Sequence, residues 1–164
     1  MLHPDLPVLP AHLAERTRAL NDRAPQRDGK YVLYWMHHAV RDHENAALDV
    51  ACTYAASLGK PVLVYQGLGG GHRHDNDRHH RFILDGAREV AAALAARGLR
   101  HVFHLPRDPR ARSPLHDLVV HACVLVCEDF PAPPFPRWTE RWAARCTAAT
   151  MAVDATCIVP MNLA

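Results

Sequence analysis

The chain has 164 residues, of which 49% are hydrophobic and 22% are charged. These proportions are those of an ordinary folded domain and exclude a disordered chain, and the longest apolar run is far too short to span a bilayer. The 19 basic and 17 acidic side chains are intermixed and leave a net charge of +2, so we expect no strong nucleic-acid binding by this chain alone. The N-terminus lacks the layout of a signal peptide, and we expect a cytoplasmic location.

Cysteines and histidines are the residues that could form disulfides or bind a metal. The five cysteines are an odd number in a chain without an export signal, so we expect free thiols. Four histidines cluster between residues 72 and 80, but two of them are adjacent and point to different faces of a predicted helix, so we expect surface histidines and no metal site. The residues concerned are Cys52, Cys123, Cys127, Cys146, Cys157, His72, His74, His79 and His80.

The predicted elements begin with a helix over residues 10–20, within a lead-in segment that spans residues 1–27. Five runs of β-branched and aromatic residues then alternate with alanine-rich helical stretches, a pattern typical of parallel βαβ units. Helices are expected at 45–58 and 77–97, ended by Gly59 and Gly98, then after Ser113 with Pro114 in first position, and at 137–146. Strands are expected at 31–36, 61–66, 100–105, 122–127 and 150–154.

These units predict an α/β fold in which one Rossmann-like, doubly wound, five-stranded parallel sheet carries helices on both faces. We expect a single domain over residues 1–164. With the common strand order 3-2-1-4-5, a crevice lies at the carboxyl edge between the first and fourth strands, where ligands of such sheets bind. Residues 35–41 and 128–130 are expected to form its two walls.

The candidate site residues are aromatic and polar groups at this edge. Tyr34, Trp35 and Met36 offer a flat apolar surface that suits an aromatic heterocycle, and core packing is the other explanation for them. Glu128 and Asp129 can accept hydrogen bonds from a ligand, whereas the alternative role of Asp129 is to cap the loop that follows it. The full predicted set is Tyr34, Trp35, Met36, His37, His38, Arg41, Gln66, Glu128, Asp129 and Phe130.

The sequence carries no recognisable motif for phosphate binding or hydrolysis. No GxGxxG follows the first strand and no GxxxxGK[ST] occurs, so we interpret Gly69, Gly70 and Gly71 as a flexible turn. No GxSxG elbow is present either. We therefore assign no catalytic residue to this chain.

Two longer segments carry more information than the fold class requires. The first is GKYVLYWM at 29–36, which follows Leu20-Asn21-Asp22 and precedes Arg41 and the NAAL of 45–48. The second is RHHRFILDG at 78–86, which is followed by Glu89-Val90. Asp129-Phe130, Arg137-Trp138 and Val159-Pro160 follow in the same order. Together these segments resemble class II cyclobutane pyrimidine dimer photolyases, of the photolyase and cryptochrome superfamily, over residues 16 to 160.

The resemblance implies the N-terminal antenna-binding α/β domain of a deoxyribodipyrimidine photolyase, a lyase that uses light to split pyrimidine dimers in DNA. The expected cofactor is an antenna chromophore, either a deazaflavin or a molecule of the FMN or pterin type. In that family FAD and the flipped-out dimer bind a helical C-terminal domain, which is the expected partner in cis. We expect neither FAD nor repair on these 164 residues alone.

Two alternatives remain open. The first is a non-catalytic interaction module derived from a photolyase, which pairs with a separate FAD-binding helical protein or forms a homo-oligomer through an exposed apolar face. The second is an unrelated nucleotide-binding Rossmann module, against which the missing glycine fingerprint counts. The sequence differs from the family pattern at Val40, His80 and residues 155–157, and some of these positions fall on the ligand edge. These differences bear on whether the domain retains an antenna site or has become an interaction module.

Overall fold

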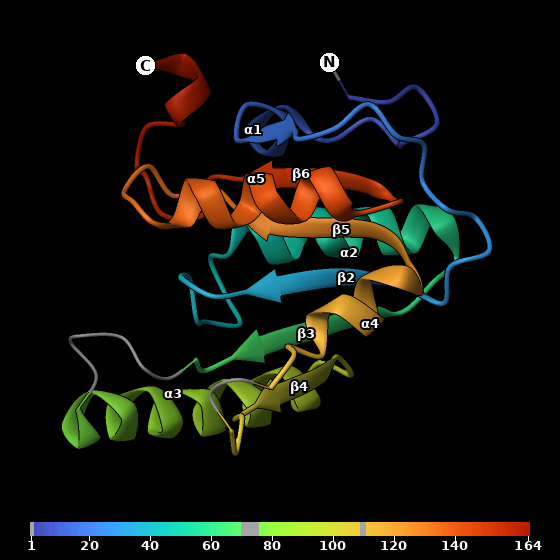
Figure 1. Ribbon diagram of the computed structural model, residues 1–164. Helices are drawn as coiled ribbons and strands as arrows, with labels where there is room; N and C mark the ends of the chain where they lie inside the picture. Colours follow the sequence, from blue (N-terminus) through green and yellow to red (C-terminus); the bar gives the residue numbers. More distant parts are fainter. Residues whose placement is uncertain (1, 70–75, 109–110) are drawn as a thin grey trace.

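A six-stranded sheet lies at the centre of the computed structural model, which describes residues 2–69, 76–108 and 111–164 (Figure 1). The order is β1-β6-β5-β2-β3-β4, and every neighbouring pair is parallel except β1 with β6. The predicted order of the five parallel strands is therefore confirmed. The strands are β1 (Thr17–Ala19), β2 (Tyr31–Met36), β3 (Val62–Gly67), β4 (Arg100–His104), β5 (Ala122–Glu128) and β6 (Ala149–Val153).

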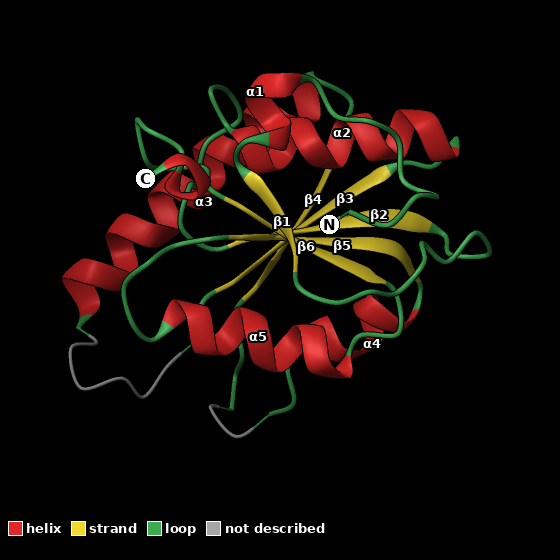
Figure 2. Cartoon of the chain, turned by 90° about the horizontal axis from the view of Figure 1, so that it is seen from above, coloured by secondary structure: helices red, strands yellow, loops and turns green. Residues whose placement is uncertain are grey.

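Helices cover both faces of the sheet (Figure 2). One face carries α1 (Ala11–Ala14), α2 (Ala46–Leu58) and α3 (Asp77–Ala96), and the other carries α4 (Leu115–Val120) and α5 (Phe135–Arg145). A short 3-10 helix, η1 (Met161–Leu163), ends the described chain. This arrangement is the doubly wound α/β fold that the sequence predicts.

The two longest helices are bounded by the residue types that the sequence suggests. The Asn45 side chain accepts a hydrogen bond from the Leu48 amide at 3.1 Å, which satisfies one free donor at the start of α2. Gly59 ends α2 in the left-handed region, with φ of 63°, and Gly98 follows α3 with φ of 74°. Both predicted glycine stops are confirmed.

The N-terminal segment differs from the prediction. The helix expected over residues 10–20 ends at Ala14, and Thr17–Ala19 forms β1 instead, paired antiparallel with β6. Strand β6 would otherwise be an edge strand with unpaired backbone groups, and pairing with β1 satisfies them. Arg18 also forms a bidentate ion pair with Asp129, with Nε to Oδ2 at 2.5 Å and Nη2 to Oδ1 at 3.0 Å. These long-range contacts outweigh the local helical pattern.

The side chains of each strand alternate between two separate cores. Val32, Tyr34 and Met36 of β2 pack toward α1, α2 and α3, whereas Leu33 and Trp35 pack toward α4 and α5. This alternation follows from the period of two in a β-strand. Each core therefore has its own set of neighbours at the carboxyl edge.

All five cysteines carry free thiols, as expected. Among the described residues, no helix is long and apolar enough to cross a bilayer.

Candidate functional site

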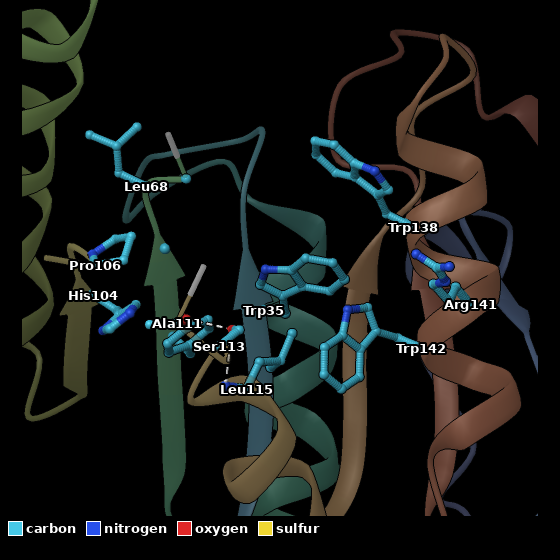
Figure 3. Close-up of a pocket in the computed structure, with 13 residues that line it drawn as sticks. Trp35, Leu68, His104, Pro106, Ala111, Ser113, Leu115, Trp138, Arg141 and Trp142 are labelled. Atoms are coloured by element: carbon cyan, nitrogen blue, oxygen red, sulfur yellow. Dashed lines mark hydrogen bonds between the residues drawn. The ribbon is translucent and has the colours of Figure 1, made fainter. Parts of the chain in front are cut away.

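A cavity of about 380 Å³ opens at the carboxyl edge of the sheet, on the α4 and α5 side (Figure 3). Its walls come from α5, from Trp35 of β2, and from the ends of β3 and β4 with the segments that follow them. The volume falls within the range usual for small-molecule sites. The residues that line it are Trp35, Tyr65, Gly67, Leu68, Gly69, His104, Pro106, Ala111, Ser113, Leu115, Trp138, Arg141 and Trp142.

All three tryptophans of the chain line this cavity. The rings of Trp35 and Trp142 meet edge to face, with centroids 6.1 Å apart and planes at 71°. Trp138 comes one helical turn before Trp142 and is 46% exposed, so its ring is available to a ligand. Large aromatic side chains of this kind suit stacking against a planar ring.

A pair of hydroxyl groups forms the polar end of the cavity. The Tyr65 hydroxyl lies 3.2 Å from Ser113 Oγ, and Tyr65 is only 2% exposed. Burial raises the pKa of the Tyr65 phenol, which therefore stays neutral and keeps its proton for hydrogen bonding. A Cβ on Gly67 would lie 3.0 Å from the Tyr65 hydroxyl, so glycine leaves room for that group.

The crevice expected between the first and fourth strands is occupied by the chain itself. Residues of the two predicted walls do meet, but they contact one another: the ring centroids of His38 and Phe130 are 3.6 Å apart. Phe135 packs against both rings, at 4.9 Å from His38 and 5.5 Å from Phe130. The cavity consequently lies one strand further along, beside β2 and β3.

Glu128 is bound within this filled crevice. Its carboxylate accepts hydrogen bonds from the Tyr34 hydroxyl at 2.5 Å and from the backbone amides of His38 at 2.5 Å and Ala39 at 3.0 Å. Burial raises the pKa of Glu128 against the opposing effect of these donors. The side chain therefore fastens the β2–α2 loop to β5 and leaves no oxygen free for a ligand.

Strand alternation separates three of the predicted site residues from the cavity. Tyr34 and Met36 are fully buried in the α2-side core, while Trp35 between them faces the cavity. Gln66 is 4% exposed and its Oε1 lies 3.2 Å from His101 Nε2. The expectation that Tyr34, Trp35 and Met36 form one flat surface is wrong, because consecutive residues of a strand point to opposite faces.

The remaining predicted residues have structural partners elsewhere. Asp129 binds Arg18 of β1, an arrangement that neither of its two expected roles included. Arg41 donates to the carbonyl oxygens of Ala155 at 2.6 Å and Glu44 at 3.1 Å, near the N-terminus of α2. His37 lies between Trp35 and Phe135, with ring centroids 4.8 and 5.7 Å away. Of the ten predicted residues, Trp35 is the one that lines the cavity.

Several residues of the cavity are not among the predicted site residues, although the sequence carries signals for some of them. Tyr65 is the register partner of Trp35 in the neighbouring parallel strand, so both side chains point to one face. Trp138 and Trp142 are four residues apart in a predicted helix, which places them on one stripe. No such pattern predicts that His104 and Ser113 line the cavity, because their positions depend on the path of the folded chain.

The histidine cluster is only partly covered by the described residues. His72 and His74 lie outside them, as do Gly70 and Gly71 of the expected turn. Within residues 2–69, 76–108 and 111–164, no group of three or more histidine, cysteine, aspartate or glutamate side chains could hold a metal ion.

Comparison with known proteins gives one informative sequence match. Over 96 residues, 58% of this chain, the sequence is 43% identical to the deoxyribodipyrimidine photo-lyase of Methanothermobacter thermautotrophicus. More than half of this chain is therefore similar in sequence to a stretch of that photolyase. The match spans only 22% of the length of that photolyase. No protein-family model matches the chain.

The fold of this chain also occurs in proteins of quite different sequence. A universal stress protein from Archaeoglobus fulgidus superposes with a TM-score of 0.52 over 76% of this chain and 98% of its own, at 18% sequence identity. At that identity the likeness concerns the fold alone, and a shared fold does not imply a shared function.

Proposed function

We propose that this chain is the light-harvesting domain of a class II photolyase and that the tryptophan-lined cavity binds its antenna chromophore. The observation that carries the proposal is the coincidence of two features in one chain. A 96-residue stretch is 43% identical to a photolyase, and a cavity of about 380 Å³ lined by Trp35, Trp138 and Trp142 opens at the carboxyl edge of the same fold.

The chemistry of the cavity fits a planar heterocycle. Tryptophan rings bind a flat ring system by stacking and edge contacts, and the Tyr65 and Ser113 hydroxyl groups can pair with ring carbonyl or nitrogen atoms. Buried hydroxyl groups that find no partner in a poor ligand select against that ligand. A deazaflavin or a flavin supplies both the rings and the polar edge.

The proposal divides the work of repair between two parts of a larger protein. Splitting a pyrimidine dimer requires FAD and a pocket for the extruded bases, and these we assign to a helical partner, in cis or as a separate cytoplasmic chain. The present domain contributes light absorption and transfers the excitation energy.

The test is a titration of the purified chain with FMN and with a deazaflavin, followed by quenching of tryptophan emission. Because all three tryptophans line the cavity, binding should quench most of the emission, and the complex should keep its visible absorption through a desalting column. Trp138→Ala should weaken binding about tenfold, as expected for the loss of one stacking partner.

Phe82→Ala provides the matched control, because Phe82 is an aromatic residue that is 78% exposed and does not line the cavity. This variant should bind like the wild type. The proposal fails if neither chromophore quenches tryptophan emission, or if the two alanine variants lose affinity equally.

A second candidate, self-association, is favoured by the first half of α3. No residue of 77–86 is buried, and Figure 1 shows this half of α3 extending past the carboxyl ends of β3 and β4. Its outer stripe consists of Arg78, Phe82, Asp85 and Glu89, spaced by four, three and four residues and all exposed.

We also propose that a second copy of the chain covers this stripe. In an antiparallel pair of α3 helices related by a two-fold axis, Arg78 of one copy meets Glu89 of the other, which gives two opposite-charge contacts. In this register Phe82 is opposite the partner's Asp85, and next to it lies Gly86, where a Cβ would have no atom within 4 Å and a ring has room. An interface of half a helix is small, so the dimer is expected to be weak.

A further inference from the structure

The cavity has a positively charged rim in addition to its aromatic walls. Arg141 lines it from α5, between Trp138 and Trp142 (Figure 3). Other arginines near the carboxyl edge are bound to the chain: Arg16 donates to the carbonyl oxygens of Cys157 and Ile158, and Arg18 binds Asp129. Arg141, in contrast, makes no hydrogen bond or ion pair with any described residue.

Further guanidinium groups lie beside the same wall. The ring of His116 packs on Trp142 with centroids 4.3 Å apart, and burial together with the nearby Arg112 and Arg145 guanidinium groups lowers the pKa of His116.

Asp108, Asp117 and Glu140 are the acidic residues that lie close in the sequence to lining residues of the cavity. Asp117 lies 3.4 Å from Arg112 and offsets part of its charge, and Glu140 is exposed on α5. None of the described residues that line the cavity is acidic. A guanidinium that has no partner among the described residues and lies beside apolar walls favours an anion attached to an aromatic ring.

We infer that the natural ligand of this cavity carries a phosphate group, which Arg141 binds while the ring system packs among the tryptophans. The inference rests on the proposed chromophore site and adds the chemical class of the ligand. The Tyr65 and Ser113 hydroxyl groups meet the polar edge of the ring at the buried end, and the phosphate lies at the open end, where Arg141 is exposed. Guanidinium binds phosphate oxygens in a bidentate manner, which fixes the direction in which the ligand enters.

FMN and riboflavin provide the test, since they share one ring system and differ in the phosphate. The wild-type chain should bind FMN about tenfold more tightly than riboflavin, a difference in the range of one exposed charge-assisted contact. Arg141→Gln should remove that difference by weakening FMN alone. Raising the salt concentration from 0.05 to about 0.5 M should also weaken FMN and leave riboflavin unchanged.

Arg23→Gln is the matched control, because Arg23 is an exposed arginine far from the cavity. Its neighbour Ala24 accepts a hydrogen bond from the Ala149 amide at the start of β6, so Arg23 lies at the amino edge of the sheet, opposite the carboxyl edge. This variant should retain the preference for FMN. Equal affinity of the wild type for FMN and riboflavin would overturn the inference and leave the chromophore site standing. Binding of neither flavin would overturn both.

AMP and adenosine test whether the phosphate-bearing ligand is a nucleotide rather than a flavin. Tighter binding of AMP than of FMN, together with a preference for AMP over adenosine that Arg141→Gln removes, would support the phosphate contact but identify a nucleotide site and contradict the antenna function. Binding of FMN with no measurable binding of AMP would support both the phosphate contact of Arg141 and the antenna function.

Discussion

Gly29 lies where the chain passes directly against the start of β5. A Cβ at this position would lie 2.5 Å from the Cys123 nitrogen and 2.8 Å from the Ala122 carbonyl carbon, and both are backbone atoms that cannot move aside. Gly29→Ala should therefore lower the free energy of unfolding by about 1–3 kcal/mol, the usual cost of overpacking. Urea denaturation monitored by circular dichroism measures the change.

Gly86 provides the comparison within the same chain. It lies inside α3, where a Cβ would meet no atom within 4 Å. Because alanine is the better helix former, Gly86→Ala should raise the free energy of unfolding by about 0.5–1 kcal/mol. A loss of stability in Gly86→Ala equal to that in Gly29→Ala would contradict the contact argument.

His37 should make the protein sensitive to acid. Its side chain is 8% exposed, neither ring nitrogen has a hydrogen-bond partner, and burial, aided by the nearby His38, lowers the pKa to about 4 from an ordinary 6.5. The unfolded chain binds this proton more readily than the folded chain. Stability should consequently fall as the pH drops from 6.5 toward 4, by about 3 kcal/mol in total.

The comparison with His37→Leu isolates this effect. The Glu128 carboxylate, 3.6 Å from the His37 ring, has a raised pKa and acts in the opposite direction, but it is present in both proteins. The difference in unfolding free energy between the two proteins should shrink or reverse in favour of His37→Leu between pH 6.5 and 4. A difference that stays constant over this range would exclude His37 as the group responsible.

The limits of sequence reasoning are clearest at single residues. The motif that contains Tyr34, Trp35 and Met36 pointed to the carboxyl edge of the sheet, and of these three residues Trp35 lines the cavity there. Tyr65 could have been predicted as well, because two strands in parallel register present matched residues to one face. The sequence could not predict that Phe130 and Phe135 fill the crevice, because their positions depend on the path of the irregular segment between β5 and α5.

At the scale of elements, local pattern predicted the long helices and the central strands well. These segments carry strong periodicity and clear boundary residues such as Asn45 and Gly59. Strand β1 was missed because its three residues gain their stability from β6 and from Asp129, which are more than 100 residues away in the sequence. Short elements made by distant partners carry little local signal.

The exposed half of α3 leads to a prediction about association. If Phe82 forms the centre of a weak antiparallel dimer, Phe82→Ser should abolish the concentration dependence of the sedimentation coefficient and leave unfolding free energy nearly unchanged, because the side chain is 78% exposed in the monomer. Arg78→Glu should weaken association, and the added Glu89→Arg should restore it. A wild-type chain that sediments as a monomer at all concentrations would contradict this dimer.

At the scale of the whole molecule, one sheet joins two hydrophobic cores. The core toward α2 contains Leu48 and Tyr54, and the core toward α4 contains Leu115 and Leu125, with β2, β3 and β5 contributing side chains to both. Neither core can lose its packing without exposing strands that the other needs. The cavity lies at the edge of the second core, so its geometry depends on the integrity of the first.

This shared sheet predicts a single cooperative unfolding transition. All three tryptophans lie on the α4 and α5 side, whereas most helical residues belong to α2 and α3 on the opposite face. Tryptophan fluorescence and far-ultraviolet circular dichroism therefore report on different faces, and their denaturation curves should coincide. Leu48→Ala, on the face without tryptophan, should shift both curves by the same amount, about 2–5 kcal/mol. A fluorescence transition that precedes the loss of helix would instead show that the face carrying the cavity unfolds by itself, and ligand binding would then stabilise that face alone.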